Sequence, residues 1–408
     1  MKTFLVLWSS QAVSLFGSAL VEFALAWHLT KETGSATILA TAMLVALLPQ
    51  VILGPLIGPF IDRWDRKKIM IIADTSVALL TTGLVVLFFT GAIEVWHIYV
   101  AMAGRAIGQA IHFPAMQASI PMIVPEKHLA RAAGLNQSLQ GMVTVLGPPA
   151  GALLLGLVPM QGVLAIDIVT AAIAVSCLLF ISIPRPQRTA QGITASPIRD
   201  MVEGFRYVWQ SPGMPVLIGL SMFIAFLFIP VFTLMPVLVQ DHLGGDVLKL
   251  GWLNSAFGVG IIVGGVMMGV WGGFKRRIIT CLMGIVLASI ATFAFGFTSE
   301  SLFSFVLLAS LLVGVGLAFG NAPIMAILQS VVPKDMQGRL FALFGSLTSA
   351  ITPIGLAIAG PAADNIGIRP LYFIAGASAL FILVLSLFSK SLMNLGSAAP
   401  TKLDVRTT

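Results

Sequence analysis

Charged residues are scarce in this sequence. Asp, Glu, Lys and Arg make up 10% of its 408 residues, whereas a soluble domain carries about 25%. This argues against a soluble enzyme or a disordered chain, because most of the sequence has no polar surface to present to water. Cysteine is rare as well. Cys177 and Cys281 both lie inside apolar runs, which argues against a disulfide framework and a thiolate metal site.

Apolar residues are abundant, at 58% of the chain with a mean hydropathy of +1.00. This is enough for roughly twelve membrane spans of about 20 residues each. Twelve apolar stretches follow one another, and we expect each to be a transmembrane helix. They cover residues 4–29, 37–61, 69–91, 96–120, 131–158, 163–183, 213–239, 248–272, 278–298, 302–330, 339–362 and 370–389.

One long polar stretch divides these spans into two sets of six. We expect an N-terminal bundle at 1–183, a cytoplasmic linker at 184–212, a C-terminal bundle at 213–393 and a cytoplasmic tail at 394–408. Apolar linker residues at helical spacing predict a short helix in the membrane interface, with a solvated linker as the alternative. These residues are Ile198, Met201, Val202, Phe205 and Trp209.

The distribution of Lys and Arg predicts the orientation, because cytoplasmic loops of membrane proteins carry an excess of both. With both termini in the cytoplasm, 19 of the 23 Lys and Arg lie on the cytoplasmic side. Only Lys31, Lys249 and Arg369 lie outside, and Arg105 is within a span. The net charge of +7 therefore orients the chain in a lipid bilayer, and we expect no nucleic-acid partner.

The two halves of the sequence show an internal repeat. Val124-Pro125 follows the fourth span and Val332-Pro333 follows the tenth, and in both cases an Arg stands six residues after the proline. Parallel six-helix repeats are how secondary transporters build a site between two halves. A coincidence of loop residues is the alternative explanation.

A basic motif follows the second span. Gly58-Pro59-Phe60-Ile61-Asp62-Arg63-Trp64-Asp65-Arg66-Lys67-Lys68 resembles the signature of the major facilitator superfamily, with Asp65 where that family usually has glycine. The resemblance covers essentially the whole chain. It implies an all-α integral membrane fold of 12 transmembrane helices in two pseudo-symmetric six-helix bundles.

In that family the motif helps to close the cytoplasmic side. The resemblance implies that Gly58 lets helices pack closely, and that Asp62 accepts hydrogen bonds from the amides that open helix 11. Arg63 and Arg66 belong to the same gating motif, although the basic residues also orient the chain. The corresponding place in the second half lacks the acidic residue, so we expect an asymmetric latch.

The fifth span contains Gly147-Pro148-Pro149-Ala150-Gly151. Proline bends a helix and glycine lets a neighbouring backbone approach. The run resembles the fifth-helix signature of facilitator antiporters, chiefly drug exporters, in which Gly147, Pro148 and Gly151 would be the motif residues; a packing kink is the alternative. Short segments such as Gln11-Ala12-Val13-Ser14-Leu15 resemble the corresponding segments of the twelve-helix drug:proton antiporters of the macrolide-efflux type. Bacterial siderophore exporters are related to these antiporters.

Ionisable residues within the spans are few, and each is expensive in a bilayer and hence a candidate for function. Two polar stripes at helical spacing are predicted to face a substrate cavity. The first contains Gln11, Ser14, Ser18 and Glu22, and the second contains Arg105, Gln109, His112, Met116 and Ser119.

Glu22 and Arg105 lie at similar depths, at about 10 and 13 Å from the outer ends of their predicted spans. We expect Glu22 to carry the coupled proton and Arg105 to be its intermittent partner, because a nearby arginine lowers a carboxyl pKa and burial raises it. A permanent ion pair that only fixes packing is the alternative.

The remaining ionisable residues have other predicted roles. His112 could titrate near neutral pH, or it could be a hydrogen-bonded polar group. Asp74 is predicted to form a salt bridge to the basic cluster at 66–68 or to another inner loop, and Asp167 is predicted to be a polar contact between helices. In the second half, Phe226 and Asn321 are predicted to line the cavity, whose aromatic and methionine-rich character suits a bulky amphiphile.

These features together predict a proton-coupled exporter of amphiphilic small molecules such as macrolide-type drugs. We expect it in the bacterial cytoplasmic membrane, as a monomer without cofactor or metal. Export of a siderophore or another endogenous metabolite is the alternative. A membrane-embedded enzyme or a sensor fits less well, because metal-ligand spacing, a nucleophile elbow and a phosphate-binding loop are all lacking.

Overall fold

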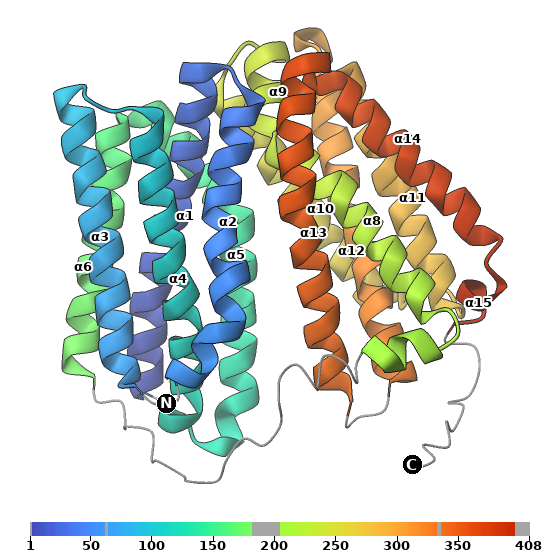
Figure 1. Cartoon of the computed structure of the whole chain (residues 1–408), viewed down its shortest axis with the longest axis horizontal. Coiled ribbons are helices and arrows are strands. Elements are labelled where there is room, and N and C mark those ends of the chain that lie inside the picture. The colour runs from blue at the N-terminus through green and yellow to red at the C-terminus, as the bar shows by residue number, and fades with distance from the viewer. Residues whose placement is uncertain (1, 62–63, 182–204, 333–335, 396–408) are drawn as a thin grey trace. The chain divides into compact units, whose positions relative to one another are not determined.

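A computed structural model describes residues 2–61, 64–181, 205–332 and 336–395. Within these ranges the protein is built of helices (Figure 1). The helices are α1 (Lys2–Thr33), α2 (Ala36–Ile61), α3 (Arg66–Thr90), α4 (Val95–Ile123), α5 (Leu129–Leu157), α6 (Met160–Phe180), α8 (Met214–Thr233), α9 (Met235–His242), α10 (Val247–Trp271), α11 (Arg277–Ala294), α12 (Phe303–Val331), α13 (Gln337–Ile366), α14 (Ile368–Leu387) and α15 (Lys390–Met393).

Eleven helices in the described ranges are long and apolar enough to cross a membrane. α4 has 29 residues, which at 1.5 Å per residue is also enough to span the hydrocarbon core, and it completes a set of twelve. Large apolar side chains lie exposed on the outer faces of the helices, for example Phe89 at 74% and Val270 at 86%. Such surfaces belong in lipid, so the all-α fold of 12 transmembrane helices is confirmed.

The seventh span differs from the prediction, which made it continuous over 213–239. The structure has α8 up to Thr233 and a separate short helix, α9, from Met235. Pro236 lies in the first turn of α9, a position that suits proline because its missing N–H would have no partner within the helix there. The carbonyl of Val231, just before the break, accepts a hydrogen bond of 3.0 Å from the buried Tyr372 hydroxyl.

The described chain divides into two compact units. The first consists of residues 1–191, 233–255 and 356–365, and the second of residues 192–232, 256–355 and 366–408. α9 and the end of α13 therefore belong to the first unit. The boundaries at 183 and 213 that we predicted for two six-helix bundles stay predictions.

In the first unit α1 packs against α5 and α6, and α4 packs against α2 and α3. Figure 1 shows these helices running lengthwise beside one another. A buried cluster on α1, α2, α3, α4 and α6 includes Val21, Leu25, Leu84, Met102 and Leu164. These contacts bring the polar stripes of α1 and α4 onto facing helices.

In the second unit α11 packs against α12 and α14. The Cα atoms of Gly284 and Gly316 face the opposing backbone, where a Cβ on Gly284 would lie 2.6 Å from the Gly316 carbonyl oxygen. The core joins these helices to α8, with Leu217, Ile285 and Leu328 among its buried members. The predicted linker helix lies largely outside the described residues, of which 205–210 are helical and carry the stacked rings of Phe205 and Trp209.

Candidate functional site

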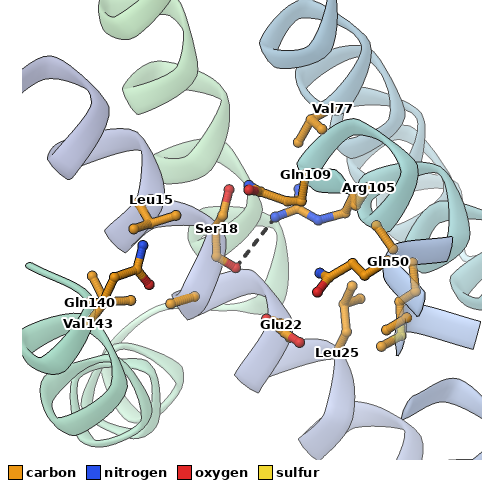
Figure 2. A pocket seen from close by; sticks show the side chains of 14 residues that line it. Leu15, Ser18, Glu22, Leu25, Gln50, Val77, Arg105, Gln109, Gln140 and Val143 are labelled. Carbon is orange, nitrogen blue, oxygen red and sulfur yellow. Dashed lines mark hydrogen bonds between the residues drawn. The ribbon is translucent and has the colours of Figure 1, made fainter. Parts of the chain in front are cut away.

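A polar cavity of about 280 Å³ opens within the first unit, and we call it the main cavity. Apolar residues such as Leu15, Leu25 and Met102 form part of its wall. Figure 2 shows polar side chains from several helices turned toward this space. The polar lining residues are Ser18, Glu22, Gln50, Arg105, Gln109 and Gln140.

A smaller cavity of about 30 Å³, the inner cavity, adjoins it. Leu15, Gln109 and Gln140 line both cavities. The two predicted stripes divide between them. Ser18, Glu22 and Arg105 line the main cavity, Gln11, Ser14, His112 and Met116 line the inner cavity, and Gln109 lines both. Ser119 is buried and lines neither, since its hydroxyl donates to the Ala115 carbonyl of its own helix. Helical spacing thus brings the stripes together, and their roles in transport stay predictions.

Arg105 lies in a hydrogen-bonded network of α1, α3, α4 and α6. Its Nη1 is 2.6 Å from Asp167 Oδ2, and it also donates to Thr81 Oγ1 at 2.5 Å. Asp167 accepts further hydrogen bonds of 3.0 Å from the hydroxyls of Ser18 and Thr81. The Asp167 side chain is 0% exposed. Both oxygens of this buried carboxylate are therefore satisfied, as a buried charge requires.

A close approach of α1 and α6 makes this network possible. A Cβ on Gly17 would lie 3.4 Å from Asp167 Cα and would overlap the Thr170 hydroxyl. Without a side chain at Gly17, the next residue, Ser18, lies within hydrogen-bonding distance of Asp167. The sequence predicts Asp167 as a polar contact between helices, and the structure shows that its partner is Arg105.

Glu22 lies on the wall of the main cavity, where its side chain is accessible to solvent. The contact that we expected between Glu22 and Arg105 is not made in this structure, because Arg105 binds Asp167 and reaches the Ser18 carbonyl at 3.4 Å (Figure 2). Among the described residues, Glu22 has neither a hydrogen bond nor a salt bridge. It is therefore a carboxyl group inside the membrane whose oxygens face open space.

The glycine and proline run of α5 packs against α1 beside Glu22. A Cβ on Gly151 would lie 2.7 Å from the ring of Phe23, and one on Gly147 would lie 3.2 Å from Ala19 Cβ. Pro148 and its neighbour Pro149 lie inside the helix. The antiporter motif thus lets α5 approach the segment of α1 that carries Glu22, and its role in transport stays a prediction.

Asp74 and His112 meet in the inner cavity, which corrects the prediction that Asp74 forms a salt bridge to the basic cluster at 66–68 or to another inner loop. Asp74 Oδ1 is 3.4 Å from His112 Nε2, and Asp74 Oδ2 accepts a long hydrogen bond of 3.3 Å from Gln11. Asp74 lies two turns along α3 from Arg66 and turns toward α1 and α4, so the cation that is nearest in the sequence is not nearest in space. Asp74 and His112 are each 8% exposed.

The structure describes only part of the facilitator signature motif at 58–68. Asp62 and Arg63 lie outside the described residues, so the gating contact predicted for Asp62 stays a prediction, as does the role of Gly58 near the end of α2. Asp65 is the N-cap of α3 and accepts from the amides of Lys67 and Lys68 at 3.1 and 3.3 Å, which gives a physical reason for an acid where the family usually has glycine. Arg66 donates to the Ala118 carbonyl at 2.6 Å and so joins α3 to α4.

Phe226 and Asn321, the two predicted cavity residues of the second half, lie on α8 and α12 in the second unit. Phe226 packs beside Gly355 of α13, and Asn321 is exposed. Their part in a cavity stays a prediction. Within the described ranges no group of three or more His, Cys, Asp or Glu side chains could hold a metal ion.

Comparisons with known proteins agree with this architecture. The family described as Major Facilitator Superfamily matches residues 7–249 and 231–403. Macrolide efflux protein A of Streptococcus pyogenes is 32% identical over 93% of this chain and 94% of its own length. Multidrug efflux pump Tap of Mycolicibacterium fortuitum is 25% identical over 94% of each chain. Among solved structures, the nucleoside transporter NupG shares the fold with a TM-score of 0.74 and 14% identity, over 95% of this chain and 98% of that one.

Proposed function

Because the chain belongs to the major facilitator superfamily, we propose that it couples the export of macrolide-type amphiphiles to proton entry, with Glu22 as the proton carrier. It is a multi-pass efflux transporter of the cell membrane. The observation that supports proton coupling is the main cavity, where Glu22 lies among polar side chains without a hydrogen bond or salt bridge from the described residues. An ionisable group is energetically costly inside a membrane, and such groups are therefore rare and usually have a function.

The coupling follows from competition for one carboxylate. When Glu22 is ionised, the main cavity is negative and attracts a cationic amphiphile. When Glu22 is protonated, that attraction is lost and the drug is released. Because the proton and the drug each weaken the binding of the other, the coupling is reciprocal. A proton taken up from outside thus favours release of the drug there, provided that the cavity opens alternately to the two sides.

Arg105 is proposed to assist proton release. Its guanidinium is fixed by Asp167 and Thr81 and lines the same cavity as Glu22. A fixed positive charge favours the ionised form of a nearby carboxyl. Movement of Glu22 toward Arg105 would therefore drive the proton off, and movement away would allow a new one to bind. Gln50, Gln109 and Gln140 offer hydrogen-bond donors and acceptors for the polar groups of the drug.

Bacteria that lack their own macrolide pumps and express the Glu22→Gln variant would test this function. We expect loss of erythromycin export, with accumulation like that of wild-type cells treated with a protonophore. Glu32→Gln is the matched control, because it makes the same change at an exposed position on the same helix. Surface expression is measured for each variant. Export by Glu22→Gln at the wild-type, protonophore-sensitive level would overturn the proposal.

A further inference from the structure

The inner cavity contains buried polar atoms that lack partners. Among the described residues, His112 Nε2 and both side-chain polar atoms of Asn136 have no hydrogen bond, and both residues are 8% exposed. At 3.4 Å the contact between His112 and Asp74 is too long for a good hydrogen bond. Buried polar atoms are normally hydrogen-bonded, and leaving them unsatisfied is costly, so a site that keeps three of them together is suited to an exchangeable partner.

The size and lining of the inner cavity indicate what that partner is. A volume of about 30 Å³ is enough for one or two water molecules, which need polar partners such as these, and it is too small for a drug. Asp74 supplies a carboxylate and His112 supplies an imidazole, and each of these groups can accept a proton. The site therefore fits water and protons.

The position of the inner cavity relates it to Glu22. Gln11, which binds Asp74, precedes Glu22 by eleven residues on α1, a distance of about 16 Å along the helix toward the cytoplasmic side. This is too far for direct proton transfer. Leu15, Gln109 and Gln140 line both cavities, so the two spaces share a wall through which water can connect them.

We propose that Asp74 and His112 form a second proton site, which receives the proton from Glu22 and passes it to the cytoplasm. The Glu22 O–H bond breaks, the proton moves through water, and an N–H bond forms at His112 Nε2. The resulting imidazolium faces the Asp74 carboxylate, which stabilises its charge. The same N–H then gives its proton to cytoplasmic water, and His112 returns to the neutral form without any change of oxidation state.

This inference rests on the proposed function, so its test must separate the two. Purified protein in liposomes that contain erythromycin and a pH-sensitive dye is diluted into drug-free buffer, and drug efflux then drives protons inward. Exchange of labelled for unlabelled erythromycin across the same membranes needs no net proton transfer. We expect His112→Gln and Asp74→Asn to lower proton influx by at least about tenfold while exchange stays within roughly twofold of wild type. Leu139→Met, an uncharged change in the lining of the same cavity, is the matched control.

Each outcome has a distinct meaning. Wild-type proton influx in His112→Gln and Asp74→Asn, with influx lost in Glu22→Gln, would overturn the second proton site and leave the proposed function standing. Wild-type influx in Glu22→Gln would overturn the proposed function itself. If exchange were also lost in His112→Gln, Asp74→Asn and Asn136→Leu alike, the inner cavity would be structural and the inference would fail.

A different observation, at the outer end of α13, supports a second inference. Gly360-Pro361-Ala362-Ala363-Asp364 repeats the Gly-Pro-x-x-Asp pattern of residues 58–62. Asp364 accepts hydrogen bonds from the Ser35 hydroxyl at 2.8 Å and from the Ala36 and Thr37 amides at 2.7 and 3.0 Å. These amides open α2, where a negative charge is stabilised.

Gly360 makes this contact possible. A Cβ at that position would lie 2.6 Å from Ala40 Cβ and 3.1 Å from Thr37 Cα, so only glycine lets the two helices approach this closely. All of these residues belong to the first unit. We infer that Gly360, Asp364 and residues 35–37 form an outer latch, which holds the outer ends of α2 and α13 together and opens during transport.

Thiol labelling tests the outer latch. After Cys177 and Cys281 are replaced by serine, Ala40→Cys lies in the buried contact with Gly360. We expect Asp364→Ala to speed its reaction with a membrane-impermeant maleimide by roughly tenfold, because hydrogen bonds to a charged group are among the stronger ones.

The controls make the result specific. Lys31→Cys, at an exposed outer position, should react at the same rate with and without Asp364→Ala. In the latched protein, erythromycin efflux should itself speed labelling at Ala40→Cys. Equal labelling of Ala40→Cys with and without Asp364→Ala, and no response to efflux, would overturn the outer latch. Gly360→Leu, which wedges the helices apart, provides a second variant with the same expected increase.

Discussion

Two buried acid–base pairs lie in the same unit, and their surroundings differ. Asp167 is joined to Arg105 at 2.6 Å and accepts two further hydrogen bonds of 3.0 Å. Asp74 and His112 are 3.4 Å apart, and Asp74 accepts one long hydrogen bond from Gln11. The first pair is saturated, whereas in the second His112 Nε2 has no hydrogen bond from the residues that the structure describes.

The difference separates structure from function among charges inside the membrane. A saturated pair loses much if either partner is removed, because the other charge is left buried and unpaired. Its polar atoms are already hydrogen-bonded and are not available to bind a ligand. A loosely bonded pair contributes little to stability and can accept a proton or water. An ionisable residue in a span is therefore a functional candidate only after its partners are known.

Asp167→Ala should lower the stability of the protein more than any other change considered for these two pairs. The change leaves Arg105 buried and unpaired, and we expect the free energy of unfolding to fall by about 3–5 kcal/mol. Tryptophan fluorescence of the purified protein in detergent, followed during denaturation, measures this change. Asp74→Ala is the control and should cost far less. If both variants were destabilised equally, the two pairs would not differ as described.

Thr81→Val should have an intermediate effect. Thr81 accepts from Arg105 and donates to Asp167, so its loss leaves buried groups unsatisfied at a cost of about 1–3 kcal/mol. Thr82→Val is the matched control, because Thr82 is exposed and its hydroxyl donates to the Ala78 carbonyl of its own helix. The same denaturation experiment applies, and equal effects of the two changes would argue against the network.

His112→Gln should have the smallest effect on stability, below about 1 kcal/mol, because His112 Nε2 has no hydrogen bond to lose among the described residues and glutamine keeps a polar group there. Unfolding is measured as before. A loss as large as that of Asp167→Ala would mean that the Asp74–His112 pair holds the fold together, against the distinction drawn here.

Part of this site could be predicted from the sequence. Spacings of three and four residues place Ser18 and Glu22 on one face of α1, and the structure has both on the wall of the main cavity. Pairing between helices could not be predicted, because it depends on how α4 and α6 pack. A systematic search for an acid opposite Arg105 could have considered Asp167, which the sequence analysis noted only as a polar contact.

The fold shows the same division. Hydropathy predicts long membrane spans, but it does not register the break between α8 and α9, which Pro236 follows. For Asp74 the prediction relied too much on closeness in the sequence. Its predicted partners were the nearest cations in the sequence, yet its side chain is directed by the helix face toward Gln11 and His112. Local spacing determines which residues share a face, and tertiary packing determines which faces meet.

The proton flux that accompanies drug efflux tests the central claim most directly. Liposomes that contain purified protein and erythromycin are diluted into drug-free buffer at equal pH, and the internal pH is followed with a trapped dye. We predict acidification with wild-type protein and none with Glu22→Gln at an equal amount of inserted protein, because the neutral glutamine resembles protonated Glu22 and does not attract the cationic drug. Acidification at the wild-type rate with Glu22→Gln would contradict it.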